Sequence, residues 1–277
     1  MTERLADISA RIERIRELGA VVNAMKGVAA ARAHGAQAQL AAVDDYAGII
    51  TTAMTCLLGG GSPGEASGPG RRPGLLVFCA EQGFAGAFSE RVLDSIDRMP
   101  PAEALFLIGT RGQSVAALRG VTAGWGAALP SHTPGLPRLA DRITTEIYRA
   151  LSEARIDCLD VVFTTWKGGR PAVVREHLFP IALTLAPGTS GQPPLTHLPD
   201  ATLLAALGQE YFNAQVCKAA LHAFAAENEA RMQAMSSAGS QIARELDSLE
   251  ATLRRVRQEA ITAEIIELGS GATAATG

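Results

Sequence analysis

The distribution of proline constrains this chain more than any other feature of its sequence. All fourteen prolines lie between Pro63 and Pro199, and the segments before and after them contain none. Proline inside a helix removes a backbone hydrogen bond and clashes with the preceding turn. The two ends of the chain can therefore form long helices, whereas the middle cannot.

Apolar residues recur at every seventh position in the N-terminal segment. One row is formed by Ile8, Ile15, Val22 and Ala29, and the adjacent row by Leu5, Ile12 and, after a small drift, Leu18 and Met25. Such a stripe is typical of a helix that packs against a second helix. The pattern predicts one coiled-coil helix over residues 1–58.

The C-terminal segment, residues 198–277, shows the same pattern more strongly. Its two apolar rows are Met235, Ile242, Leu249 and Val256, and Leu246, Leu253 and Ala260. The pattern predicts a helix from about Thr202 to Leu268, on the order of 100 Å long at about 1.5 Å per residue. No compact domain of this size is that wide, so the helix needs a partner outside such a body. The N-terminal helix is the obvious one, and we expect the two ends to form an antiparallel coiled coil.

The composition between the two ends changes twice. Residues 59–73 are rich in glycine, which predicts a flexible linker. Residues 74–197 then alternate short apolar runs with helical stretches, which predicts a small central Rossmann-like α/β domain with a partly parallel sheet. The expected strands are 75–79, 104–108, 159–166, 171–178 and 181–185, with helices over about 87–98 and 136–154 and a hairpin turn at 167–170.

Composition and charge exclude several classes of protein. A hydrophobic fraction of 47% with a net charge of −3 excludes a disordered chain and gives no electrostatic reason to expect nucleic acid. The four cysteines lie far apart without a C-x-x-C pair, so we expect free thiols. No apolar stretch reaches the ~20 residues of a membrane helix, and the N-terminus lacks the apolar core of a signal peptide. We therefore expect a soluble protein that reaches a membrane only through partners.

No residue pattern predicts a catalytic, cofactor or metal site. The loops at Gly83 and Gly109 follow apolar runs, as phosphate-binding loops do, but neither contains G-x-G-x-x-G or G-x-x-x-x-G-K-[ST]. None of the five histidines stands in H-E-x-x-H or beside a cysteine. Glu227 and Glu229, two residues apart, do not share a helix face, so we expect them on a solvated surface. The sequence predicts a chain with no catalytic site, cofactor or metal of its own.

Three arginines surround Val256 of the second apolar stripe, at positions 254, 255 and 257. A guanidinium group carries a planar fork of donors that suits carboxylates. Two interpretations remain open from these residues alone: contact with a partner, with Arg254 and Arg257 among the contacting side chains, or a solvated helix face.

Three motifs in order along the chain resemble the γ subunit of F-type ATP synthases. Asn23–Arg32 resembles the family's Ala-Met-Lys-Met-Val-Ala-Ala-Ala-Lys, Glu227–Met235 its Ser-Glu-x-x-Ala-Arg-Met-x-Ala-Met, and Arg257–Ile265 its Arg-Gln-x-x-Ile-Thr-x-Glu-Ile. The resemblance is close at both ends and loose in the middle. The family's Asp-Arg-Gly-Leu-Cys-Gly-Gly loop appears as Glu81–Ala87, and its Thr-Gln-Lys-Ile-Thr-Lys run, with two lysines lost, as Leu18–Asn23. The divergence indicates a variant, and the lack of a transit peptide and of the chloroplast cysteine insertion favours a bacterial complex.

The resemblance implies a rotor shaft that couples ion flow to ATP synthesis or hydrolysis. In the family, the terminal helices turn inside a ring of α and β subunits, and the globular part meets the ε subunit and the membrane c-ring. It implies a non-catalytic subunit, peripheral on the cytoplasmic side of a bacterial inner membrane. Matching positions assign contact with β subunits to Met25 and Lys26, and to Arg257, Gln258 and Thr262. The alternatives are a nucleotide-binding α/β enzyme with a helical dimerisation arm and a plain coiled-coil scaffold.

Overall fold

In the sequence, a central α/β region lies between two long helices. The computed structural model describes residues 2–58, 72–96, 100–181 and 196–274. Helix α1 spans Thr2–Leu58 and helix α5 spans Asp200–Ala274, so α5 continues past Gly269, where the sequence had predicted its end. The predicted linker lies almost wholly outside the described residues.

Contacts divide the chain into two compact units. The first unit consists of Met1–Val28 and Met232–Gly277, and the second of Ala29–Arg231. Both boundaries fall inside α1 and α5, whereas the segments expected from the sequence ended where these helices end. Each long helix therefore contributes to both units.

In the first unit, α1 and α5 pair in antiparallel orientation. A Cβ atom placed on Gly19 would lie 3.3 Å from Cγ2 of Ile242, and one on Gly239 would lie 4.0 Å from Cγ1 of Val22. Residue numbers thus rise along one helix while they fall along the other. The predicted antiparallel coiled coil of the two chain ends is confirmed.

The side chains of the two apolar stripes are the ones withdrawn from solvent in this unit. Ile12, Val22, Met235 and Val256 are at most 9% exposed. Apart from Leu18, the remaining stripe residues of this unit are half-buried: Leu5, Ile8, Ile15, Met25, Ile242, Leu246, Leu249, Leu253 and Ala260. Leu18 is 53% exposed and therefore lies off the contact face, although the heptad count had placed it there. A contact between only two helices hides one narrow face of each.

The second unit is built on a five-stranded sheet in the order β3-β2-β1-β4-β5. Its strands are β1 Pro73–Phe78, β2 Leu105–Ile108, β3 Trp125–Ala127, β4 Cys158–Lys167 and β5 Arg170–Phe179. All neighbouring pairs are parallel except β4 and β5, which form the predicted hairpin around Gly168 and Gly169. Strand β3 was not predicted, since three residues are too few for a hydrophobic pattern. Of the expected strand 181–185, only Ile181 is described, and it is not in a strand.

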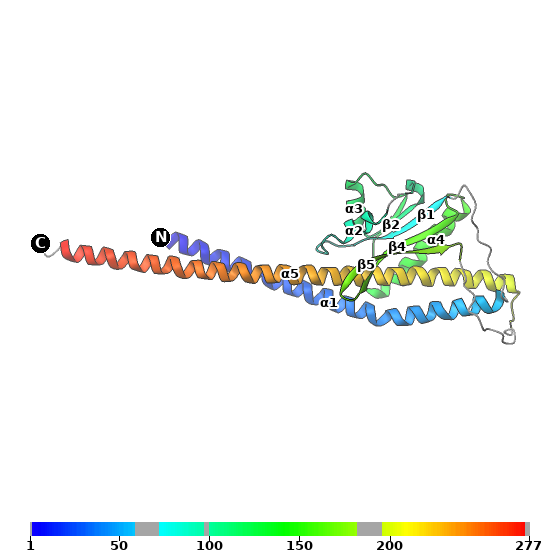
Figure 1. The fold of residues 1–277 in the computed structure, drawn as a ribbon, viewed down its shortest axis with the longest axis horizontal. Coiled ribbons are helices and arrows are strands. Elements are labelled where there is room, and N and C mark those ends of the chain that lie inside the picture. Colours follow the sequence, from blue (N-terminus) through cyan, green and yellow to red (C-terminus); the bar gives the residue numbers. More distant parts are fainter. Residues whose placement is uncertain (1, 59–71, 97–99, 182–195, 275–277) are drawn as a thin grey trace. The chain divides into compact units, whose positions relative to one another are not determined.

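Helices cover both faces of this sheet and make three layers (Figure 1). Helix α4 (Leu136–Ser152) and α5 pack on the face that contains Leu76, Phe106 and Val161. Helices α2 (Phe88–Asp94) and α3 (Thr110–Leu118) pack on the opposite face, which contains Leu75 and Leu107. Central parallel strands with both faces buried explain the continuous apolar runs that the sequence shows there.

The two long helices are also antiparallel neighbours inside the second unit. Lys218 Nζ lies 3.3 Å from Asp44 Oδ1, and Gln37 Nε2 donates to Glu229 Oε1 at 2.9 Å. A small apolar cluster of Ala47, Ile50, Met54 and Ala214 continues the contact. Gln37 lies opposite Glu229, and Asp44, which comes later in α1, lies opposite Lys218, which comes earlier in α5. The two helices therefore run in opposite directions here as well.

The composition of helix α1 departs from the expectation that no apolar stretch is long enough to cross a membrane. By length and composition, the stretch Leu5–Leu57 contains a window apolar enough to cross a membrane. One such helix is weak evidence, because core helices of water-soluble proteins pass the same test. In each unit α1 instead has a protein partner for its apolar face, namely α5.

Candidate functional site

The residues predicted to contact partners present exposed side chains in the first unit. On α5, Arg254, Arg257, Gln258 and Thr262 are exposed. The Thr262 hydroxyl donates to the Gln258 backbone carbonyl oxygen at 2.9 Å. Within the described part of the chain, neither Arg254 nor Arg257 forms an ion pair. Their donors are therefore available to carboxylates of another subunit.

The predicted contact residues of α1 lie elsewhere along the helix pair. Lys26 is exposed and Met25 is half-buried. Because Val22 faces Gly239, both residues lie beside the part of α5 near Met235. About twenty residues of α5, on the order of 30 Å at 1.5 Å per residue, separate that point from Arg254 and Arg257. The structure thus places the predicted contacts in two separate groups.

The last turns of α5 extend beyond the end of α1. The register of Gly19 with Ile242 places Leu5 opposite Val256, close to the start of α1. From Arg257 to Ile266 every side chain is exposed except that of Ala260, which is half-buried. Ile261, Ile265 and Ile266 are 50%, 64% and 64% exposed. By the same register, Thr2 at the start of α1 lies opposite Glu259. We call the stretch 257–274 the terminal stretch of α5.

A groove of about 270 Å³ lies between the paired helices, just before the terminal stretch along α5. Arg254 lines it together with Ile12, Arg16 and Glu250. Arg16 bridges Glu250 and Glu13, each at 2.7 Å, and these hydrogen bonds, the one to Glu250 first, raise the pKa of Arg16. Exposed ion pairs of this kind fix the register of two helices more than they stabilise them.

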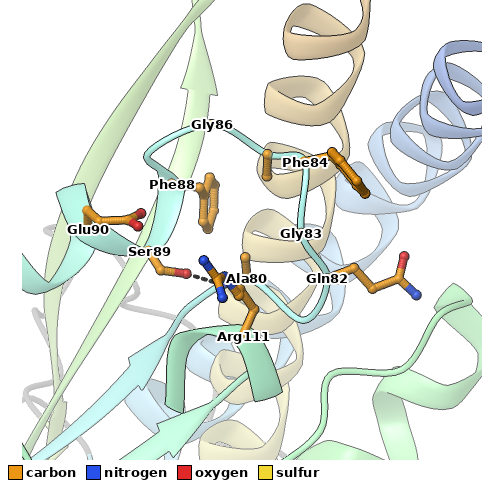
Figure 2. A pocket seen from close by; sticks show the side chains of 10 residues that line it. Ala80, Gln82, Gly83, Phe84, Gly86, Phe88, Ser89, Glu90 and Arg111 are labelled. Carbon is orange, nitrogen blue, oxygen red and sulfur yellow. Dashed lines mark hydrogen bonds between the residues drawn. The ribbon is translucent and has the colours of Figure 1, made fainter. Parts of the chain in front are cut away.

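In the second unit, a cavity of about 400 Å³ opens at the loop between β1 and α2 (Figure 2). The Ala80 N–H donates to the Ser89 hydroxyl oxygen at 3.1 Å, and the Arg111 side chain points toward the same place. Phe84 turns away, with 68% of its surface exposed and φ at +62°. This is the loop at Gly83 that the sequence offered as a candidate phosphate site.

A carboxylate of the chain itself, that of Glu81, occupies the donors at the start of α3, directly after the second candidate loop, which contains Gly109. Glu81 accepts the backbone N–H of Thr110 at 2.9 Å and its hydroxyl proton at 2.7 Å, at the start of α3. It also accepts the N–H of Leu129 at 2.8 Å. A phosphate at a helix N-terminus would need the same donors. The arrangement therefore favours a structural role for the loop over nucleotide binding.

Packing accounts for the glycines of the second candidate loop. Gly109 has φ at +103°, and a Cβ atom on it would lie 2.5 Å from the Cys79 carbonyl oxygen. A Cβ on Gly112 would lie 2.0 Å from Cβ of Cys79. Both residues let α3 approach β1 closely, which is the structural explanation for glycine at such turns.

The cysteines also have a structural setting. Burial, followed by the charge of Glu90, raises the pKa of the Cys79 thiol to about 12. Burial raises the pKa of the Cys217 thiol to about 11. A protonated, buried thiol is a poor nucleophile and a poor metal ligand. Across the described ranges, no three His, Cys, Asp or Glu side chains gather as a metal site requires.

A buried polar cluster on α5 was not predicted from the sequence. Glu227, Asn228 and Arg231 are 3%, 2% and 5% exposed. Glu227 forms an ion pair with Arg231, so the expectation of a solvated Glu227 was wrong. Glu229 is half-buried and bonds to Gln37. The available signal was the spacing of Glu227 and Arg231, which places opposite charges on one helix face.

Comparison with known proteins agrees with this architecture. Residues 4–275 match a family model described as ATP synthase. The chain is 27% identical over 279 residues to an ATP synthase gamma chain of Moorella thermoacetica, covering 98% of each, and 28% identical over 293 residues to that of Solibacter usitatus, covering 98% and 99%. A chain from the rotational state 3 structure of the Euglena gracilis mitochondrial ATP synthase (OSCP/F1/c-ring) matches with a TM-score of 0.65 and 14% identity, covering 99% of this chain and 95% of that one.

The rotor of the same Euglena gracilis enzyme, in rotational state 1, matches with a TM-score of 0.63 and 12% identity, covering 94% of this chain and all of that one. At these identities the two structural likenesses show a shared fold. The chain belongs to the gamma-chain family of ATP synthases.

Proposed function

We propose that this chain is the central rotor shaft of an F-type ATP synthase. It couples ion flow through the membrane sector to ATP synthesis or hydrolysis in a ring of α and β subunits. The observation that carries the proposal is the antiparallel pair of α1 and α5, with two exposed arginines, Arg254 and Arg257, that have no ion partner among the described residues. The c-ring and the ε subunit are the proposed partners of the α/β unit.

A shaft must resist twisting and bending, and the two apolar stripes supply this resistance. Each buried side chain of one helix packs against the other helix, as in coiled coils. The surface near the end must also slide past its surroundings. Ile261, Ala263 and Ile265 are exposed and apolar, so a surrounding ring holds them with few directional contacts. This combination suits rotation better than a fixed coiled-coil scaffold.

Two groups of side chains are the proposed contacts with β subunits. One group lies in the terminal stretch of α5 and consists of Arg257, Gln258 and Thr262, with Arg254 one turn before Gln258. Met25 and Lys26 form the other group. Guanidinium groups without an internal ion partner can each bind a carboxylate with two parallel hydrogen bonds. Such contacts would make ring conformation depend on the angle of the shaft.

The proposed role assigns the chemistry of ATP to partner subunits and gives this chain no active site. We infer a peripheral location on the cytoplasmic side of a bacterial inner membrane. The chain would reach the membrane only through the c-ring. The Glu81 carboxylate at the start of α3 supports this over the nucleotide-binding alternative.

The decisive test is reconstitution with the other subunits. The tagged chain is co-expressed with α, β, ε and the membrane sector, the complex is purified, and ATP-driven ion pumping is measured in vesicles. We expect α and β to co-purify and pumping to depend on this chain. A complex that assembles and pumps equally well without the chain would refute the proposal. Binding of ATP or NAD to the isolated chain with micromolar affinity would instead favour the enzyme alternative.

A further inference from the structure

Between Ala225 and Arg231, α5 meets the α/β region through an unusual set of side chains. The buried apolar residues in this stretch are Ala225, Ala226 and Ala230. Alanine allows close approach but offers little to interlock, and apolar contact is non-directional. The large buried side chains of the stretch are the polar ones: Glu227, Asn228 and Arg231. Rotation of the helix about its axis is therefore opposed here mainly by polar contacts.

These polar side chains bind the backbone of the β1–α2 loop. Glu227 accepts the N–H groups of Glu81 at 3.0 Å and Gln82 at 3.2 Å. Arg231 donates from Nε to the carbonyl oxygen of Gly83 at 3.2 Å and from Nη2 to that of Gln82 at 3.3 Å. The two side chains also pair with each other. We call Glu227, Arg231 and these loop contacts the clamp.

Asn228 supports the clamp from within α5. It accepts from Arg231 Nη1 at 3.1 Å and donates to the Phe224 carbonyl oxygen at 2.8 Å. The contact with Nη1 orients the guanidinium group, and the contact with Phe224 holds the Asn228 amide in place. The clamp thus has both a fixed acceptor and a fixed donor on α5, each aimed at complementary backbone groups of one loop.

The loop is in turn bound to the rest of the α/β region. Glu81 accepts from Thr110 at the start of α3 and from Leu129 beyond β3. A continuous series of hydrogen bonds therefore runs from α5 through residues 81–83 to two further segments of the sheet unit. Hydrogen bonds weaken steeply when their angles change, so this series resists turning of α5 within the unit.

We propose that the clamp is a rotational lock that makes α5 and the sheet unit turn together. Glu227 and Arg231 are positioning residues, since they act through the loop and touch no reacting atom. The inference rests on the proposed rotor function. Arg231 is the last residue of α5 in the second unit, directly before the stretch that forms the coiled coil. Torque applied to the sheet unit would therefore enter the shaft helix at this turn.

The test compares Glu227→Gln and Arg231→Met with a matched buried carboxylate, Glu146→Gln. Glu146 is 7% exposed and pairs with Arg149 and Arg155 at 2.5 and 2.9 Å, away from the clamp. In the full-length chain, we expect both clamp variants to speed amide hydrogen exchange at Gln82 about tenfold, because Glu227→Gln removes the charge of the acceptor of this amide and Arg231→Met removes the partner that holds that acceptor in place. Glu146→Gln is expected to leave this amide unchanged.

The second readout is the number of ions pumped per ATP hydrolysed by the assembled complex. We expect this ratio to fall in Glu227→Gln and Arg231→Met and to stay at the wild-type value in Glu146→Gln, even where all three lower thermal stability. A purely structural role would reduce the amount of complex but not the ratio. An unchanged ratio in the clamp variants, the same loss in Glu146→Gln, or unchanged exchange at Gln82 would overturn the lock. A wild-type complex that does not pump would instead contradict the proposed function.

Discussion

At the scale of single residues, the same residue type has different roles according to its surroundings. Arg231 is 5% exposed and bound to a loop, whereas Arg257 is exposed and has no ion partner among the described residues. Removing a buried charge leaves its partners unsatisfied, while removing an exposed one costs the fold little. The two arginines should therefore be separable by experiment.

We expect Arg257→Ala to weaken coupling while the isolated chain still folds. Its exposed side chain should change the free energy of unfolding by less than about 0.5 kcal/mol. Thermal unfolding of the chain and ions pumped per ATP in the complex measure the two effects. Arg255→Ala, which removes an exposed arginine that pairs with Glu259 at 4.0 Å, is the control. Equal pumping ratios in wild type and Arg257→Ala would count against the contact.

We expect Gly109→Ala to destabilise the α/β unit. The new Cβ would meet the Cys79 carbonyl oxygen at 2.5 Å, at a φ of +103°. Strain of both kinds should cost about 2–4 kcal/mol and lower Tm by several degrees. Gly83→Ala is the control, since nothing lies within 4 Å of its Cβ position. Similar Tm values for the two variants would show that Gly109 is not required by packing.

His222 gives the folded chain a pH dependence with a defined sign. Burial lowers the pKa of its imidazole, which lies beside Phe163 with ring centres 5.7 Å apart. The unfolded state then binds more protons, so the stabilising contribution is full above about pH 6.5 and is lost as pH falls through the lowered pKa. We expect Tm to decrease between pH 7.5 and 5, and to decrease less in His222→Phe. Parallel Tm curves would rule out His222 as the cause.

Sequence reasoning at this scale recovered residues whose role depends on local chemistry and missed those that depend on distant contacts. The absence of a phosphate-binding motif around Gly109 could be read from the sequence, because such motifs are local patterns of residues. The burial of Glu227 could not, because its partners include the backbone of Glu81, 146 positions earlier in the chain. Spacing along one helix cannot reveal such a contact.

At the scale of elements, α5 is the part on which the rest depends. It packs on the sheet, carries the clamp residues, pairs with α1 and ends in the terminal stretch. Its existence followed from the absence of proline after Pro199 and from its heptad rows. Its end did not follow, because Gly269 and Gly271 lower helix propensity without stopping the helix at once. Strand β3 was not predicted because its three residues are too few to show a hydrophobic pattern.

We expect Leu249→Pro to abolish assembly. Proline in a helix interior costs about 3 kcal/mol or more and kinks the helix, and Leu249 is a half-buried member of the contact face. Loss of helical circular dichroism and of co-purification with α and β subunits would report it. Leu249→Met, which keeps volume and helix propensity, should assemble normally. An intact complex carrying Leu249→Pro would refute the coiled coil as the shaft.

At the scale of the whole molecule, each of the two units has its own source of stability. The sheet unit has a three-layer apolar core, whereas the helix pair buries one narrow face of each helix. Stability therefore differs along the chain, as local opening energies generally do. The overall class of fold could be predicted from proline placement and apolar periodicity. The boundary between the units could not, because it falls inside uninterrupted helices.

We expect amide exchange to divide the isolated chain at this boundary. Amides of α5 before Arg231 should exchange more slowly than those after Val256, where α5 extends beyond the start of α1. Hydrogen-exchange mass spectrometry of the free chain and of the complex measures the difference. The amides after Val256 should become protected on assembly, whereas uniform protection in the free chain would contradict the division.

The terminal stretch of α5 bears on how wide an opening in a partner must be to admit it. A single α-helix with side chains is about 10–12 Å across, and a pair is about twice as wide. An opening that admits only α5 can therefore be narrower than one that admits both α1 and α5.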